Sequence, residues 1–387
     1  MIATEYNGAS ASAVLTLAQE LIRRRSVTPD DAGCCALIAQ RLVAAGMRTE
    51  FIDSGPVRNL LAMHGSGAPH LMLLGHTDVV PPGPEQDWTD PPFAAVVRSG
   101  YLYGRGAADM KGSVAAFLIA LEQFLAERPE HAGTLSLLLT SDEEGVAEDG
   151  VRAVVPQLKA RGLLPDYCLV GEPSSRAQLG DEIRIGRRGS IQARLTVRGT
   201  QGHTAYAHPA DNPVHRAGPL LAELGQLVYE DGDDWFPPTK LQISNVHAGT
   251  GAENVTPGAL EIWFNIRNNP HSPADVLKGR IEALIAGHDP GPWCLDWRVS
   301  GVPFGPAGGA LPEAVTAACR EVLGREPEAN TGGGTSDGRF LGPEGVSVVE
   351  LGPVNRSIHQ VNECLSVADL ERLPALYGGV IRRLLDR

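Results

Sequence analysis

Two pairs of side chains that could do chemistry each follow a short, strongly apolar segment. His76 and Asp78 come directly after HLMLLG, and Glu143 and Glu144 come directly after TLSLLLTSD. Both segments are rich in leucine and bounded by turn-forming residues, which is typical of strands buried on both faces. Open α/β sheets bind their ligands where the parallel strands end. Imidazole and carboxylate groups at such ends predict a hydrolytic metal site.

Each signal taken singly has a more ordinary explanation. His76 and Asp78 lie two residues apart, so in an extended segment they point to the same side, and the carboxylate can fix the tautomer of a ligating imidazole. A lone pair of this kind is nevertheless more often structural. Asp109 lies in a glycine-rich loop before a predicted helix, where an aspartate often serves as an N-cap. Glu143 and Glu144 could be surface acids.

The joint occurrence of these residues favours the metal site. Three predicted strand ends each supply a metal-compatible side chain, the third being Glu172 in GEP, and the glycine-rich loop supplies Asp109. Two adjacent carboxylates commonly provide one metal ligand and one general base. Carboxylate and imidazole groups without thiolate suit a zinc or related divalent pair, which needs a bridging carboxylate and terminal ligands on each ion. A further ligand could come from His359, which follows the strand VVELGP.

The elements that must position these residues alternate between strand and helix over the first 186 residues. Apolar runs predict strands, and spacings near 3.6 residues predict helices. Strands are expected at 49–53, 59–63, 71–74, 135–139 and 166–170; helices are expected at 11–46 (a pair broken near 26–29), 114–127 and 150–161. The alternation predicts an α/β catalytic domain whose mixed, largely parallel sheet is flanked by helices.

The pattern changes after about residue 186. The segment SIQARLTVRGTQGH alternates apolar and polar residues, as a half-exposed antiparallel strand does. A helix from about 212 to 230, two strands and another helix follow. This β-α-β-β-α order predicts a small two-layer α+β domain at 187–297, inserted into a catalytic domain made of 1–186 and 298–387.

The composition excludes several classes of protein. The chain has 387 residues, of which 43% are hydrophobic and 20% charged, as in ordinary globular proteins of one or two domains. Its net charge of -13 and its lack of a Lys/Arg run argue against nucleic acid or an anionic membrane as a partner. No apolar run approaches the roughly 20 residues that span a bilayer. The first residues, MIATEYNGAS, do not resemble a signal peptide.

The cysteines indicate a reducing compartment. Six are present, none in a CxxC pair: Cys34, Cys35, Cys168, Cys294, Cys319 and Cys364. Such scattered residues in a chain of this size predict free buried thiols rather than a disulfide framework. We therefore expect a cytoplasmic protein.

A series of motifs along the whole chain carries a family resemblance. In order, they are GHTDVVPPG, GRGAADMKG, TSDEEG, GEPSS, GRRGS, GTQGHTAYAHPADNPVH, GTGAENVTPG, TGGGTSDGRF and IHQVNE. Together they resemble the bacterial succinyl-diaminopimelate desuccinylase family, within the di-zinc superfamily of aminoacylases and glutamate carboxypeptidases. HTD, the aspartate loop and the paired glutamates are shared by the superfamily. GRRGS, AHPADNPVH, GTGAENVTPG and TGGGTSDGRF look specific to the desuccinylases.

The resemblance implies roles for the metal-site residues. It implies two Zn²⁺ ions per subunit, with Co²⁺ able to substitute, and Asp109 as the bridging ligand. By the same resemblance, His76 and Glu172 complete one ion, and Glu144 and His359 complete the other. Glu143 is then the general base that activates water and protonates the leaving amine, while Asp78 orients His76.

The resemblance also implies a homodimer and a set of substrate contacts. His203, which by itself would be read as an exposed loop histidine, resembles a residue that stabilises the oxyanion from the partner subunit, so the inserted domain is expected to act as a lid and in dimerisation. His208 and His215 are interpreted as exposed loop histidines. Residues matching positions that contact the substrate's carboxylates or amine are Arg187, Ser190, Tyr206, Asn254, Arg267, Gly334, Thr335, Arg339 and Asn355.

The implied reaction is hydrolysis of N-succinyl-LL-2,6-diaminopimelate to succinate and LL-2,6-diaminopimelate, a step of lysine and diaminopimelate biosynthesis. The nearest alternative is an acetylornithine deacetylase or another N-acyl-amino-acid amidohydrolase, which would lack the specific motifs. A non-catalytic metal-binding relative is an alternative of a different class. It would have lost a ligand or the base, and here His76, Asp109, Glu143, Glu144, Glu172 and His359 are all present.

Overall fold

The computed structural model describes residues 12–206 and 211–386, which divide into two compact units. Unit 1 contains the chain up to Gly186 together with Ala307–Asn330 and the C-terminal part from Ser336. Unit 2 contains Arg187–Pro306 and the short return Thr331–Thr335. The signal-peptide expectation for the first residues and the interpretation of His208 lie outside the described residues.

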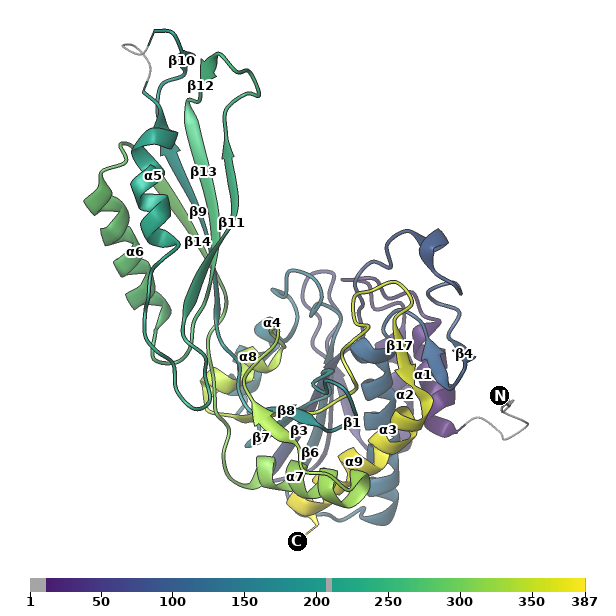
Figure 1. Cartoon of the computed structure of the whole chain (residues 1–387). Helices are drawn as coiled ribbons and strands as arrows, with labels where there is room; N and C mark the ends of the chain where they lie inside the picture. Colours follow the sequence, from purple (N-terminus) through teal and green to yellow (C-terminus); the bar gives the residue numbers. More distant parts are fainter. Residues whose placement is uncertain (1–11, 207–210, 387) are drawn as a thin grey trace. The chain divides into compact units, whose positions relative to one another are not determined.

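Unit 1 is built on an eight-stranded mixed sheet (Figure 1). In spatial order its strands are β1 (Arg48–Phe51), β2 (Leu60–Gly65), β6 (Thr134–Thr140), β3 (His70–His76), β7 (Tyr167–Val170), β16 (Ser347–Glu350), β8 (Glu182–Arg184) and β15 (Glu328–Asn330). The central strands β6, β3, β7 and β16 are parallel to one another. β1 and β2 add to the sheet in antiparallel fashion, and β8 is antiparallel to β16. The expected mixed, largely parallel sheet is confirmed.

Helices pack on the sheet because its strands alternate apolar side chains between two faces. On β3, Leu71 and Leu73 join the main core cluster, whereas the equally buried Met72 and Leu74 point to the other face. The helices that pack together with the main core are α1 (Ala13–Ile22), α2 (Cys34–Ala44), α3 (Gly112–Glu127), α7 (Ala310–Leu323) and α9 (Val367–Leu385). Helices α4 (Val151–Ala160) and α8 (Gly338–Leu341) pack against each other, and α8 contacts β7 and β16.

Unit 2 is a two-layer α+β structure, as the alternating sequence predicts. Its antiparallel sheet has the order β11 (Lys240–Ala248), β13 (Ala259–Arg267), β9 (Ser190–Arg198) and β14 (Trp293–Gly301). Helices α5 (Pro213–Leu224) and α6 (Ala274–His288) share a core with one face of this sheet (Figure 1). Along β9, residues 191, 193, 195 and 197 are buried in that core, and the residues between them are more exposed.

The predicted domain boundary at residue 297 is wrong because it cuts through β14. This strand pairs with β9 from Trp293 to Gly301, so the whole strand belongs to unit 2. The segment alternates apolar residues with more polar ones, and its Leu295, Trp297 and Val299 pack against the core of unit 2. The sequence analysis missed this pattern because it took the β-α-β-β-α order as the whole insert.

Two small sheets complete the described strands. Unit 1 contains β17 (Cys364–Ser366), β5 (Tyr101–Tyr103) and β4 (Val96–Arg98), and unit 2 contains β10 (Gly202–His203) paired with β12 (Val255–Thr256). All six cysteines are free, and four are buried, but Cys294 on β14 is exposed, contrary to expectation. Within the described ranges, no helix combines the length and the apolar character needed to span a membrane.

Candidate metal centre

Three of the predicted ligands meet because their strands are parallel neighbours. His76 is the last residue of β3, Glu144 follows β6, and Glu172 follows β7. The order β6-β3-β7 places these strands side by side, and parallel strands end at the same edge of a sheet. This edge of the unit 1 sheet therefore collects an imidazole and two carboxylates from segments far apart in the sequence.

Two loops supply the remaining predicted ligands. Asp109 lies in a non-helical segment just before α3, with φ -114° and ψ 92°. His359 follows β16 after a loop and adopts a positive φ of 60°. Both side chains reach the same edge, so all five predicted ligands come together in unit 1.

The two oxygens of Asp109 face different histidines. Oδ1 lies 3.4 Å from His76 Nε2, and Oδ2 lies 3.2 Å from His359 Nε2. Glu172 Oε1 is 3.8 Å from His76 Nε2, while Glu144 Oε1 is 2.9 Å from His359 Nε2. This arrangement separates one set of His76, Glu172 and Asp109 from another of His359, Glu144 and Asp109, as a carboxylate-bridged pair of ions requires.

Ligand atoms also fall into a second grouping. His76, Asp109 and Glu144 have such atoms within 4.8 Å of one another, and so do His76, Glu143 and Glu172. Glu143 thus lies close enough to the cluster to act either as a ligand or as a base. We favour the assignment from the individual contacts, because they place one oxygen of Asp109 against each histidine. The second grouping leaves out His359.

The electrostatics of the cluster call for positive charge. Burial, then the charges of Asp109 and Glu143, raise the pKa of Glu172 well above its usual range. Burial lowers the pKa of His76, but contact with Asp109 and the charges of Glu172 and Asp78 raise it well above its usual value overall. Contacts with Asp109 and Glu144 raise the pKa of His359 to about 10. Carboxylates crowded in this way fit divalent cations, which would neutralise them.

A buried nitrogen of His76 without a hydrogen-bond partner also fits a metal ligand. His76 is 1% exposed, and its Nε2 has no hydrogen-bond partner although Asp109 lies near it. Buried polar atoms are normally partnered, so an orphaned imidazole nitrogen among carboxylates is the expected state of a metal ligand. Oxygen and nitrogen ligands of this kind suit Zn²⁺ and related ions.

Asp78 acts differently from the sequence-based expectation. His76 Nδ1 contacts the backbone carbonyl of Asp78 at 2.9 Å, while the Asp78 carboxylate lies 3.6 Å away. That carboxylate accepts backbone N–H groups of Glu143 at 3.4 Å and of Glu144 at 3.1 Å. Its side chain therefore holds the paired glutamates, and its main-chain carbonyl is the group of Asp78 that lies nearer to the histidine ring.

Two residues of the TSDGRF motif lie near the catalytic candidate Glu143: Arg339, a predicted substrate contact, and Asp337, for which no role was predicted. Arg339 Nη1 lies 3.8 Å from Glu143 Oε1, and its Nη2 lies 3.9 Å from Asp337 Oδ1. Both carboxylate oxygens of Asp337 are buried without hydrogen-bond partners, and burial raises the pKa of Asp337 to about 6. Burial, and next the charge of Asp337, also raise the pKa of Glu143 well above its usual range. The motif TSDGRF contained this aspartate, but its type alone gave no role.

The predicted substrate-contacting residues of unit 2 form two groups. One group is at the start of β9: Ser190 Oγ accepts side-chain N–H groups of Gln192 and Asn265 at 3.1 Å each. Arg187 is buried and donates to the carbonyl of Gly332, and Arg267 ends β13, which pairs antiparallel to β9. Gly334 and Thr335 lie in the short return segment of the same unit.

The second group lies beyond the other end of β9. His203 in β10 pairs with Val255 in β12, and the backbone N–H of Thr204 donates to the carbonyl of Asn254 at 3.0 Å. The rings of His203 and Tyr206 are 5.4 Å apart, and Tyr206 is 69% exposed. Figure 1 shows β10 and β12 beyond the end of the sheet at which β9 finishes, with Arg198. His215, interpreted as a loop residue, is exposed but lies in α5.

The remaining two predicted substrate contacts belong to unit 1. Arg339 is 8% exposed in α8, and Asn355 is half-buried, with its backbone N–H donating to the carbonyl of Ser175 at 2.9 Å. We call the sheet edge of unit 1 that carries the five predicted ligands the metal edge. Among the described ion pairs, Arg339 is the cation nearest to Glu143 there.

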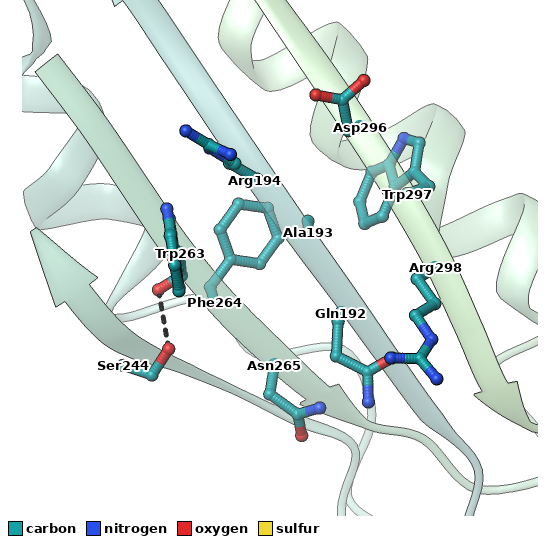
Figure 2. Close-up of a pocket in the computed structure, with 10 residues that line it drawn as sticks. All are labelled: Gln192, Ala193, Arg194, Ser244, Trp263, Phe264, Asn265, Asp296, Trp297 and Arg298. Atoms are coloured by element: carbon teal, nitrogen blue, oxygen red, sulfur yellow. Dashed lines mark hydrogen bonds between the residues drawn. The ribbon is translucent and has the colours of Figure 1, made fainter. Parts of the chain in front are cut away.

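The sheet of unit 2 also carries a hollow of about 350 Å³ that contains none of the predicted ligands (Figure 2). Figure 2 shows Trp263, Arg194 and Asp296 around it, with Gln192 and Asn265 nearer the Ser190 end. The hollow is therefore next to the first group of predicted substrate contacts, but its charges are mixed, and it does not resemble a metal or acid-base site.

Comparison with known proteins gives consistent matches. Residues 72–383 match the sequence profile of Peptidase family M20/M25/M40. A succinyl-diaminopimelate desuccinylase of Stenotrophomonas maltophilia is 57% identical, over 97% of this chain and 100% of its own length. Another, of Halorhodospira halophila, is 56% identical over 97% of this chain and 99% of its own length.

Solved structures share the fold at low sequence identity. An M20 family metallo-carboxypeptidase of Sulfolobus solfataricus has a TM-score of 0.78 at 16% identity, with coverage of 96% of this chain and 99% of that chain. The YXEP protein of Bacillus subtilis, a dinuclear metal-binding peptidase, has a TM-score of 0.71 at 16% identity, with coverage of 95% and 96%. These likenesses concern the fold of the chain.

Proposed function

The chain belongs to peptidase family M20/M25/M40, and from this premise we propose that it hydrolyses N-succinyl-LL-2,6-diaminopimelate to succinate and LL-2,6-diaminopimelate. The observation that carries the proposal is the full-length identity to curated succinyl-diaminopimelate desuccinylases. The enzyme is a metal-dependent amidohydrolase of lysine and diaminopimelate biosynthesis. The cluster of imidazoles and carboxylates at the sheet edge of unit 1 is the site that we assign to this reaction.

We propose two Zn²⁺ ions as the native metals, with Co²⁺ as a substitute. His76, Asp109 and Glu172 would hold one ion, and Asp109, Glu144 and His359 the other. When bound, such ions lower the pKa of a water molecule toward about 7 and polarise the scissile carbonyl. The contacts of Asp109 with both histidines support this assignment.

Glu143 performs the proton transfers in this mechanism. It takes a proton from the attacking water as the water oxygen adds to the acyl carbon, and it gives that proton to the amine nitrogen as the C–N bond breaks. A general base works best when its pKa lies near the operating pH. Burial and the neighbouring Asp337 raise the pKa of Glu143, which supports the role. The Asp78 carboxylate holds the backbone of Glu143 in place.

Arg339 provides a cation for a substrate carboxylate close to this base. Its guanidinium group lies beyond hydrogen-bond distance of both Glu143 and Asp337, so its donors remain available to a planar carboxylate. The substrate carries several carboxylates while the chain has a net charge of -13, so local cations rather than the overall field must attract it.

We further propose a homodimer in which His203 acts on the substrate bound by its partner. The two groups of predicted contacts in unit 2 lie at opposite ends of β9, a strand of nine residues that spans about 26 Å. One small substrate does not reach both groups of the same chain. A second copy of the chain could instead supply His203, Tyr206 and Asn254 to the substrate. These three residues are exposed, so a partner subunit can approach them.

Mixed dimers test this arrangement directly. We would co-express Glu143→Ala and His203→Ala chains with different tags and purify the heterodimer. If His203 acts across the interface, one of its two sites has both intact residues, and activity should recover to about half of wild type. A heterodimer no more active than its two parents would contradict the shared site, and a monomeric wild type in sedimentation would contradict the dimer.

An assay with two substrates tests the reaction itself. Zinc-loaded protein is compared on N-succinyl-LL-2,6-diaminopimelate and N-acetylornithine, with and without a chelator. We expect a strong preference for the succinylated substrate and complete loss of activity on chelation. Faster hydrolysis of N-acetylornithine would overturn the substrate assignment while leaving the metal chemistry intact.

We also propose a cytoplasmic location, which the six free cysteines support.

A further inference from the structure

Glu363 is a fully buried carboxylate to which the mechanism above gives no role. Its Oε2 accepts from Arg105 Nη1 at 2.8 Å and from the backbone N–H of Gly106 at 2.9 Å. Its Oε1 accepts from the backbone N–H groups of Ala108 and Asp109 at 3.0 Å each. A carboxylate has about four acceptor positions. One short stretch of chain, residues 105–109, therefore supplies donors for all of them.

The contact joins two segments that each carry a proposed metal ligand. Asp109 is the proposed bridging ligand, and His359 lies four residues before Glu363. Main-chain contacts also connect the two segments. The backbone N–H of Gly104 donates to the carbonyl of Glu363 at 3.0 Å, and the following strand β17 pairs with β5. The segments of Asp109 and His359 are thus fastened together by side chain and main chain at one point.

The backbone around Asp109 needs this acceptor. Its φ and ψ are non-helical, so the N–H groups of Ala108 and Asp109 are not used in the first turn of α3. Both residues are buried, and buried backbone donors without partners are strongly unfavourable. A single anionic acceptor with two oxygens satisfies these two N–H groups at once and holds the loop in the one conformation that presents Asp109 to both histidines.

We propose that Glu363 is a positioning residue of the metal centre: its carboxylate sets the backbone of Asp109 relative to the His359 segment. The inference rests on the proposed function in one respect, that Asp109 and His359 are metal ligands. It does not depend on the identity of the substrate.

Titration with Co²⁺ tests the inference without any substrate. Metal-free wild type and Glu363→Gln are titrated, the bound Co²⁺ is counted by equilibrium dialysis, and its visible absorption spectrum is recorded. Glutamine has the shape of glutamate, but its amide NH₂ must face two of the four donors. We expect Co²⁺ affinity to fall by about 10- to 100-fold, as for other residues that orient ligands, with a changed spectrum.

Arg105→Gln is the matched control because it removes the charged partner and leaves the acceptor for Ala108 and Asp109 in place. It should lower the unfolding temperature yet keep the wild-type affinity and spectrum. Equal metal loss in both variants would mean that Glu363 acts through general stability, and wild-type binding in Glu363→Gln would refute the proposal outright. If Glu363→Gln does not fold, Glu363→Asp, which keeps the charge but shortens the reach, replaces it and must lose affinity.

The outcome is separable from that of the proposed function. Wild-type protein that binds two Co²⁺ ions but leaves N-succinyl-LL-2,6-diaminopimelate intact would remove the substrate assignment and leave the role of Glu363 standing. Wild-type protein that binds no Co²⁺ would overturn both the metal centre and the role of Glu363.

Discussion

The metal edge of unit 1 and the far end of the unit 2 sheet differ in how their functional side chains are held. At the metal edge, His76 is 1% exposed and Asp109 6% exposed. Asp109 is held by Glu363 from a distant segment, and His76 contacts the nearby Asp78 carbonyl and lies 3.4 Å from the distant Asp109 carboxylate. At the far end, Tyr206 is 69% exposed, and His203 Nδ1 accepts only a local N–H, from Ala205, among the described contacts.

The difference indicates two kinds of assembly. The metal edge is pre-organised within one chain, because three parallel strands end there and two loops are tied to it. Around His203 the backbone is paired between β10 and β12 but the side chains are exposed, which suits the proposed positioning of these groups by a partner subunit. Changes at the metal edge should therefore affect metal binding and chemistry, and changes at the far end should affect chemistry alone.

Removing the metals should have the largest effect. Chelation should abolish hydrolysis, and the metal-free protein should lose stability as pH rises from 6 to 10. Burial raises the pKa of Glu172, and contacts with Asp109 and Glu144 raise that of His359 to about 10. A group whose pKa is raised on folding stabilises the fold at low pH and loses this contribution as pH rises through the folded pKa.

Unfolding temperatures measured with and without chelator across this pH range check the prediction. The gap between metal-loaded and metal-free protein should widen with pH, because the ions neutralise the deprotonated cluster. A constant gap would contradict the crowding of charges that we infer at the metal edge.

Replacing the general base should have the next largest effect. Glu143→Ala should lower kcat by about 10²- to 10⁴-fold, since general-base catalysis contributes on this order, while two metal ions remain bound. The measurements are kcat and metal content by mass spectrometry. Glu144→Ala is the control and should lose metal. Metal loss in Glu143→Ala would show that base and ligand are assigned the wrong way round.

The far end of unit 2 should respond in turnover alone. His203→Ala should lower kcat by about 10²- to 10³-fold, the usual cost of removing one oxyanion donor, with metal content unchanged. His215→Ala, another exposed histidine of unit 2, is the matched control and should behave as wild type. Near-normal turnover of His203→Ala would eliminate its role and, with it, the functional contrast between the two regions.

The smallest effect is expected at the start of β9. Ser190→Ala should raise KM roughly three- to tenfold at nearly constant kcat, because one hydrogen bond to a substrate is lost. Ser244→Ala, on the same sheet, is the control and should leave both constants unchanged. A fall in kcat without a change in KM would place Ser190 in the chemistry rather than in substrate binding.

Much of the fold follows from local patterns in the sequence. Leucine-rich runs predicted β3 and β6, a short apolar run at 166–170 predicted β7, and the rule that parallel strands end at one edge predicted that His76, Glu144 and Glu172 would meet. The boundary at residue 297 was wrong because it cut through β14: the alternation of this strand was present in the sequence, but only its pairing with β9 shows that it belongs to unit 2.

The roles of Asp337 and Glu363 were not predicted, although both lie in motifs that the sequence analysis quoted. An acidic residue gives no sign of its hydrogen-bond partners when these are far away in the chain. Glu363 is bound by donors more than 250 positions earlier, and the function of Asp78 depended on whether its carbonyl or its carboxylate came closer to His76.

The sequence alone determined the kinds of ligand and their places at strand ends, because strand burial is expressed locally as a run of apolar residues. The tertiary structure decided which oxygen of Asp109 faces which histidine, which carboxylate anchors the Asp109 loop, and which ends of β9 carry Ser190 and the His203 group. These features depend on strand order, register and long-range hydrogen bonds, which arise from contacts between distant segments and have no local pattern in the chain.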